Sequence, residues 1–126
     1  MGRKESDGLT KLELKIMQVI WRLGPSSVTA VQEAMEPPPA YTTVQTMLNI
    51  LERKGKLKRR LRGRAYEYSA AVTETKAVTH AVRDLVDRMF AGSSEELVMS
   101  LIKTRQLDRA TIARLTKRIE EEGEGE

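Results

Sequence analysis

Apolar side chains along residues 9–54 recur at the three- and four-residue spacing of helices that bury one face. The first predicted helix begins at Thr10, which forms a capping box with Glu13, and it runs to about Leu23, where Gly24-Pro25 ends it. Its apolar stripe, on which Trp21 is interpreted as a core residue, comprises Leu12, Ile16, Met17, Ile20, Trp21 and Leu23.

A short second helix is expected next. Thr29 is its expected cap, because Gln32 follows three residues later and can complete a second capping box. A run of three prolines stops this helix after about seven residues, and a helix so short must pack on its neighbours to be stable. Its buried side comprises Val31, Ala34 and Met35.

The third helix begins between Ala40 and Thr42 and runs to Lys54, with Gly55 as its stop. Its apolar stripe comprises Val44, Met47, Leu48 and Leu51. The opposite face carries short, uncharged side chains and one arginine, whereas an ordinary exposed helix face is rich in the better helix formers Glu and Lys. The lost helix propensity indicates that this face contacts a partner, although a merely polar surface is the plainer interpretation. The residues of this face are Thr42, Thr43, Gln45, Thr46, Asn49 and Arg53.

A β-hairpin is predicted over residues 57–69. Tyr66 and Tyr68 alternate with small or polar residues, as in a strand with one buried face, and Gly63 allows the positive φ of a tight turn. Three helices followed by a basic hairpin are the plan of a winged helix–turn–helix. A helix about 10–12 Å across fits the major groove of DNA, and Thr, Gln and Asn can donate to and accept from base edges.

The charge of the 126-residue chain supports this interpretation. Residues 1–72 hold 13 Lys and Arg against 7 Asp and Glu, a net charge of +6, whereas residues 73–126 hold 9 against 11, a net charge of −2. Eight of the twelve residues 53–64 are basic and none is acidic, which indicates a polyanionic partner more than a solvated loop. The hairpin arginines are expected to neutralise phosphates or to enter the minor groove. They are Arg59, Arg60, Arg62 and Arg64.

Residues 73–120 predict three more helices. The first carries the 4-3-4 spacing of a helix-pairing seam, and Ser93 and Asp108 are the expected caps of the other two. A segment this small buries too little surface to be stable alone, so a twofold dimer of this segment is predicted, with packing on the winged domain of the same chain as the alternative. The expected dimer residues are Val78, Val82, Leu85, Met89, Phe90, Leu97, Leu101, Ile112, Leu115 and Ile119.

The composition excludes several kinds of site. The chain has no cysteine and one histidine, His80, which excludes disulfides, Cys-ligated zinc, iron–sulfur clusters and thiol catalysis and argues against a His-rich metal site. No apolar run reaches the roughly 18 residues that cross a bilayer, and no signal-peptide core follows the charged start. We expect a cytoplasmic protein with no cofactor, no metal, no catalytic residue and no membrane insertion.

Three blocks of the sequence carry a family resemblance. The first runs from Leu9-Thr10 to Ile20-Trp21. The second is Ala40-Tyr41-Thr42-Thr43-Val44-Gln45-Thr46-Met47-Leu48-Asn49-Ile50-Leu51, and the third is Gly63-Arg64-Ala65-Tyr66-Glu67-Tyr68. Together with the C-terminal Leu and Ile pattern, they resemble the penicillinase-repressor family over about residues 9–120. This family contains the β-lactamase, methicillin-resistance and copper-responsive repressors.

The resemblance implies a winged-helix DNA-binding domain followed by an α-helical dimerisation domain, and binding of dyad operators with half-sites resembling TACA/TGTA. In the β-lactam branch, a membrane sensor protease system relieves repression by cleavage in the dimerisation domain, and the residues leave open whether this applies here. Copper sensing through a C-terminal Cys motif does not carry over, because the chain has no Cys. The resemblance places Tyr41, Thr42, Thr43, Gln45, Thr46 and Asn49 on the recognition helix and Arg62 and Arg64 in the wing.

The predicted fold is mainly α with a small β wing. We expect a disordered tail over residues 1–8, a winged helix–turn–helix domain over 9–72, a three-helix dimerisation domain over 73–120 and an acidic, frayed tail over 121–126. The predicted function is that of a dimeric, sequence-specific transcriptional repressor, not an enzyme. The alternatives are a non-specific architectural or RNA-binding protein that uses the same hairpin, and a winged-helix regulator of another family, such as the multiple-antibiotic-resistance regulators.

Overall fold

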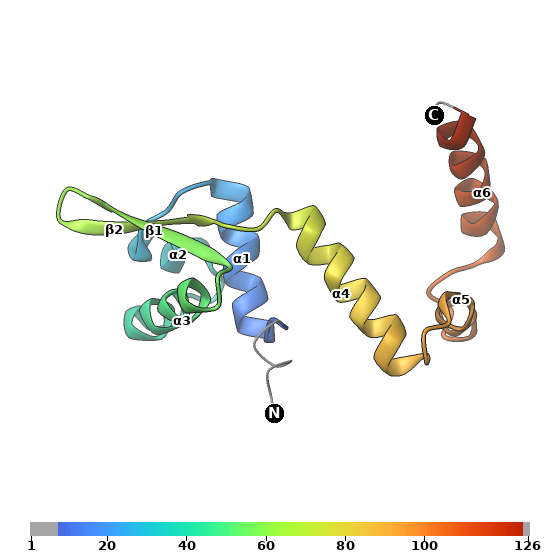
Figure 1. The fold of residues 1–126 in the computed structure, drawn as a ribbon, viewed down its shortest axis with the longest axis horizontal. Coiled ribbons are helices and arrows are strands. Elements are labelled where there is room, and N and C mark those ends of the chain that lie inside the picture. Colours follow the sequence, from blue (N-terminus) through green and yellow to red (C-terminus); the bar gives the residue numbers. More distant parts are fainter. Residues whose placement is uncertain (1–7, 125–126) are drawn as a thin grey trace. The chain divides into compact units, whose positions relative to one another are not determined.

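The computed structural model describes residues 8–124, which form six helices and one β-hairpin (Figure 1). They divide into two compact units, one ending at Ala81 and one beginning at Val82, and this division lies inside α4. Residues 1–7 and 125–126 of the two expected tails lie outside the described residues. The elements are α1 (Lys11–Leu23), α2 (Val28–Ala34), α3 (Tyr41–Arg53), β1 (Leu57–Arg62), β2 (Ala65–Ala70), α4 (Glu74–Met89), α5 (Ser94–Lys103) and α6 (Arg109–Glu124). This order confirms a mainly helical fold with a small β wing.

Helix α1 begins and ends where its sequence predicts. The Thr10 hydroxyl oxygen accepts a hydrogen bond from the Glu13 amide at 3.2 Å, and the Glu13 carboxylate accepts one from the Thr10 amide at 2.9 Å. Gly24 ends the helix with a φ of 87°, which L side chains rarely adopt. Leu23, in the last turn, departs from the predicted stripe because it is 50% exposed, while Val19 is buried instead.

Helix α2 has a different cap from the predicted one. The Ser27 hydroxyl accepts a hydrogen bond from the Ala30 amide at 3.1 Å, so Ser27 and not Thr29 is the N-cap. Gln32 therefore forms no capping box with Thr29. Its side-chain amide donates to the Pro39 carbonyl at 2.9 Å, which joins the proline segment to α2. Serine and threonine are both good caps, so local preference alone does not separate the two positions.

Three helices and the base of the hairpin enclose one hydrophobic core. Trp21 packs against it, as predicted, and its indole nitrogen donates to the Val72 carbonyl at 3.0 Å, so the chain that leaves the hairpin is joined to α1. Met47 is only partly buried. The core residues are Ile16, Met17, Val19, Ile20, Val28, Val31, Met35, Val44, Leu48, Leu51, Leu57 and Tyr68.

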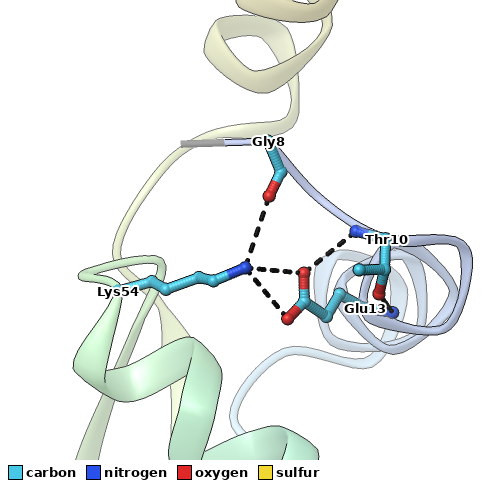
Figure 2. A network of polar contacts seen from close by, with 4 residues as sticks. All are labelled: Gly8, Thr10, Glu13 and Lys54. Atoms are coloured by element: carbon cyan, nitrogen blue, oxygen red, sulfur yellow. Dashed lines mark hydrogen bonds and ion pairs between the residues drawn. The ribbon is translucent and has the colours of Figure 1, made fainter. Parts of the chain in front are cut away.

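A buried ion pair joins the start of α1 to the end of α3 (Figure 2). Glu13 is 3% exposed, and the Lys54 Nζ lies 3.0 Å from both of its carboxylate oxygens and 3.4 Å from the Gly8 carbonyl oxygen. Lys54 is the C-cap residue of α3, where a cation also interacts favourably with the helix dipole. One of the eight basic residues in the 53–64 block therefore holds two helices together and adds little to an exposed basic surface.

The hairpin forms around Gly63 and Arg64 as predicted. Strand β1 pairs antiparallel with β2 from Leu57 opposite Ala70 to Arg62 opposite Ala65, and Gly63 has a φ of 66°. Tyr68 is 2% exposed, and its backbone exchanges hydrogen bonds of 2.8 and 2.9 Å with Ser26. Tyr66, closer to the tip, is 43% exposed, because the hairpin extends beyond the helices of its unit (Figure 1). Only one of the two tyrosines is therefore a core residue.

The second unit has the predicted caps but no core within one chain. The Ser93 hydroxyl accepts from the Glu96 amide at 3.1 Å, and the Asp108 carboxylate accepts from the Thr111 amide at 2.8 Å. Helix α6 continues through Glu124, beyond its predicted end at residue 120, because a single helical glycine costs only about 1 kcal/mol. Among the described residues from Val82 onward, no hydrophobic side chain is buried.

Candidate nucleic-acid interface

Helix α3 has one fully buried face and one exposed polar face. Val44, Leu48 and Leu51 have no exposed surface, which determines the rotation of the helix about its axis. The residues predicted to face a DNA groove are consequently exposed, with the exception of Asn49. These exposed residues are Tyr41, at 45%, together with Thr42, Thr43, Gln45, Thr46 and Arg53.

Asn49 differs from the other polar residues of α3. It is half-buried, and its Oδ1 accepts a hydrogen bond of 3.0 Å from the hydroxyl of Tyr68 on β2. The side chain therefore has one end bound within the protein, and only its other end is available to an external partner.

The start of α3 has no side-chain cap. Ala40 occupies the N-cap position, and no side-chain hydrogen bond caps the helix there. Uncapped amides at a helix start carry a partial positive charge and favour an anion, such as a phosphate. Tyr41 and Thr42 belong to this first turn, so their exposed side chains lie beside the uncapped amides.

Two wing arginines approach the same carboxylate. The Arg60 and Arg62 guanidinium groups lie 3.6 and 3.8 Å from Oε1 of Glu67. Their side chains remain 70% and 64% exposed, so these ion pairs are weak and a phosphate can compete for either arginine. Arg64 lies in the turn, and the part of the chain that the structure describes provides no ion-pair or stacking partner for it.

Arg59 lies between the side chains of two tyrosines. Its guanidinium carbon lies 4.4 Å from the centroid of the Tyr66 ring, in cation–π contact, and in the hairpin register it pairs with Tyr68. The pKa of Arg59 is raised above its ordinary value, chiefly by a hydrogen bond with the Tyr68 side chain and also by the charge interactions with Tyr66 and Glu52. Arg59 is therefore a permanent cation with a restrained orientation.

Sequence reasoning missed Glu67 and Tyr66 as neighbours of the wing arginines. A turn at Gly63-Arg64 implies a register in which Glu67 lies directly opposite Arg60, while Tyr66 is the diagonal neighbour of Arg59. Directly opposed residues of an antiparallel pair interact, and diagonal neighbours are within reach of long side chains, so the predicted turn already contained this signal.

Within residues 8–124, no group of three or more His, Asp or Glu side chains is arranged to hold a metal ion. None of the described helices combines the length and the apolar character that a membrane span requires.

The sequence is similar to repressor sequences along most of its length. A family model described as penicillinase repressor matches residues 9–121. A penicillinase repressor of Bacillus licheniformis is 25% identical over 120 residues, which cover 94% of this chain and 94% of the relative. An uncharacterised 16.5 kDa protein in the ptsI 3′ region of Latilactobacillus sakei is 25% identical over 114 residues, which cover 89% of this chain and 78% of the relative.

Two solved structures are also similar. One is the solution structure of the monomeric form of Bacillus licheniformis BlaI in complex with the blaP half-operator, at 29% identity and a TM-score of 0.46, which covers 53% of this chain and 84% of that one. The other is the crystal structure of AbfR of Staphylococcus epidermidis, at 15% identity and a TM-score of 0.48, which covers 90% of this chain and 78% of that one.

Proposed function

Since this chain belongs to the penicillinase repressor family and is thereby a DNA-binding transcriptional repressor, we propose that it binds a dyad operator as a homodimer, through α3 and the wing. Membership also assigns the chain to a family of repressors and not of enzymes, and the alternative of a regulator from another winged-helix family does not apply. The dimer, the dyad and the residues that contact DNA are the finer parts of this proposal.

The observation that carries the proposal is the division of α3 into two faces. The buried face holds the helix in the core, while the exposed face consists of short side chains that both donate and accept hydrogen bonds. Such side chains read base edges in the major groove. We assign this role to Thr43, Gln45 and Thr46, and we assign phosphate contacts to the first turn, at Tyr41 and Thr42, and to Arg53 at the other end of the helix.

The wing supplies the cations for the DNA backbone in this proposal. Arg64 in the turn is exposed and has no partner among the described side chains, whereas Arg60 and Arg62 exchange the Glu67 carboxylate for phosphate. Guanidinium contacts to phosphate position a protein on the duplex without reading sequence. The wing therefore contributes affinity, and α3 contributes specificity.

The exposed apolar seam of α4 supports the dimer. Val78, Val82, Leu85 and Met89 are 52%, 47%, 42% and 70% exposed, and no residue of α4 or α5 is buried. A monomer gains almost no burial energy from α4 and α5, whereas a second copy covers the seam in a twofold interface. Two winged units then lie on one duplex, which requires an operator with two related half-sites.

Selection of DNA from a random-sequence duplex library by the full chain tests the proposed specificity. We expect enrichment of a dyad whose half-sites are separated by about 10 base pairs or a multiple of that spacing. We also expect affinity to fall steeply with salt concentration. Binding that is equally strong to every duplex would support the non-specific architectural alternative instead.

Sedimentation of two matched variants tests the proposed dimer. Leu85→Asp places a charge in the apolar seam and is expected to give a monomer at micromolar concentration. His80→Asp adds the same carboxylate at an exposed position off the seam and is expected to remain dimeric. A wild-type chain that sediments as a monomer at these concentrations would contradict the dimer.

Relief of repression by a sensor protease is compatible with this arrangement. A cut within residues 73–120 separates the winged unit from part of the proposed dimer interface. A chain cut at a single engineered site in this segment is expected to sediment as a monomer and to bind the selected operator more weakly than the intact chain.

A further inference from the structure

Three polar side chains connect the wing to the exposed face of α3. Arg59 lies on β1, Tyr68 lies opposite it on β2, and Asn49 lies on α3. The Tyr68 hydroxyl donates a hydrogen bond of 3.0 Å to Oδ1 of Asn49, and Arg59 is the residue paired with Tyr68 in the hairpin register. A side chain that faces the proposed DNA groove is thus bound to a residue of the hydrophobic core.

Tyr68 is a rigid anchor for this connection. It is 2% exposed, and two backbone hydrogen bonds to Ser26 hold its position on β2. The ring packs in the core, so its hydroxyl cannot move away from α3 without disturbing the core. Asn49 is half-buried, and its Oδ1 is the atom that meets this hydroxyl.

The hydrogen bond between Tyr68 and Asn49 determines the orientation of the Asn49 amide. The Tyr68 hydroxyl donates its single hydrogen to Asn49 at 3.0 Å, and the atom that accepts it is Oδ1. The amide group of Asn49 therefore turns its NH2 group away from Tyr68.

This orientation limits what Asn49 can recognise. An asparagine that pairs with adenine in the major groove uses its oxygen and its NH2 group together, on N6 and N7. With Oδ1 turned toward Tyr68, the NH2 group is the end of the amide that faces away from the protein contact, and guanine presents two adjacent acceptors, O6 and N7, in the place where adenine presents N6 and N7. Adenine presents its own N6 donor there, which opposes the NH2 group.

We propose, building on the operator-binding function above, that Tyr68 is a positioning residue that holds the Asn49 NH2 group outward, so that α3 selects guanine over adenine at one base pair of each half-site. Asn49 makes the contact, and Tyr68 acts only through it.

The test uses the best duplex that the wild-type full chain selects from a random library, with each base pair then changed singly. Asn49→Ala is expected to abolish the preference at one base pair per half-site, where the wild type favours guanine over adenine by about tenfold. Tyr68→Phe releases the amide and is expected to reduce that ratio to about threefold or less, with preferences at other base pairs retained. The double variant is expected to show no further change relative to Asn49→Ala, because Tyr68 acts only through Asn49.

Two further variants separate positioning from folding. Asn49→Asp keeps an acceptor for the Tyr68 hydroxyl and loses both donors, so it is expected to lose the guanine preference even if Tyr68→Phe does not fold. Ser69→Ala removes a hydroxyl from the adjacent position of β2 and is expected to leave the ratio unchanged.

The possible outcomes are distinct. A guanine-to-adenine ratio that Tyr68→Phe leaves unchanged, or a loss of affinity that is equal at all base pairs, would overturn the role of Tyr68 and leave operator binding intact. The same holds if Asn49→Ala changes no base preference. Failure of the wild-type chain to enrich any sequence would instead overturn the proposed operator binding, and this inference with it.

Discussion

Replacement of Lys54 by methionine is expected to destabilise the winged unit by about 3 kcal/mol. The substitution retains most of the side-chain volume but removes the ammonium group that lies 3.0 Å from both oxygens of Glu13. The Glu13 side chain is 4% exposed, so its carboxylate would stay buried with the backbone amide of Thr10 as its remaining hydrogen-bond partner.

The magnitude follows from the burial of the two partners. Removal of one partner of a buried ion pair costs about 3–5 kcal/mol, because the other charge remains uncompensated. The Lys54 side chain is 19% exposed and the Thr10 hydrogen bond persists, so the lower end of this range applies. For a domain whose total stability is about 5–15 kcal/mol, the loss is a large fraction of the whole.

Urea unfolding followed by Trp21 fluorescence measures the effect. Trp21 is the single tryptophan of the chain, and its indole donates to the Val72 carbonyl, so its emission reports unfolding of this unit. With a urea dependence of about 1–2 kcal/mol per molar, the midpoint is expected to fall by roughly 1.5–3 M. Lys11→Met, at an exposed position of α1, is the matched control and is expected to change stability by less than about 0.5 kcal/mol.

The double variant Glu13→Gln with Lys54→Met distinguishes a buried charge from lost packing. Its glutamine is neutral and can still accept from the Thr10 amide, so it is expected to recover much of the stability that Lys54→Met loses. If Lys54→Met behaves like Lys11→Met, or if the double variant is less stable than the single one, the ion pair does not have the role assigned to it.

Three further predictions concern DNA binding and pH. Gln45→Ala is expected to weaken binding to the selected operator by about 1–3 kcal/mol and to leave binding to a random duplex nearly unchanged, as measured by titration of both duplexes. Arg64→Ala is expected to weaken binding to both duplexes and to reduce the salt dependence of the binding constant. Glu67→Gln removes the carboxylate near Arg60 and Arg62 and is expected to strengthen binding to the random duplex. The pKa of Asp108 is lowered, mainly by the hydrogen bond from the Thr111 amide and also by the Thr111 side chain. The helix cap formed by Asp108 therefore stabilises the folded state above the ordinary pKa of aspartate. This stabilisation is lost as the pH falls through the lowered pKa. The helical circular-dichroism signal is expected to show this loss on acidification. Asp108→Asn is a cap that does not titrate, so it is expected to abolish this pH dependence. If the variant has the same pH profile as the wild type, Asp108 does not have the capping role assigned to it.

Much of the fold was predictable because its signals are local. The capping box at Thr10 and Glu13, the helix stop at Gly24 and the hairpin turn at Gly63 each depend on residues within a few positions of one another. Hydrogen bonds of this range form in the same way wherever the element lies in the molecule. The apolar positions at three- and four-residue spacing likewise indicated which face of α3 is buried.

The same local signals were ambiguous where two choices satisfied them equally. Ser27 and Thr29 are both good N-caps, and the contacts of the whole unit place the helix start at Ser27. Leu23 fits the helical stripe of α1 and is nevertheless half-exposed. The periodicity of a sequence indicates which side of a helix is buried, but it does not indicate how far along the helix the neighbouring elements cover that side.

The sequence by itself therefore determined the order of the helices and the wing, the polar face of α3 and the basic character of the N-terminal half. Only the tertiary structure decided that Lys54 pairs with Glu13, 41 positions away, and that Asn49 is bound to Tyr68, 19 positions away. The physical reason is that helix and turn preferences act over a few residues, whereas these pairs exist only once the packed core brings distant parts of the chain into contact. Those pairs determine which of the charged and polar side chains remain free to meet DNA.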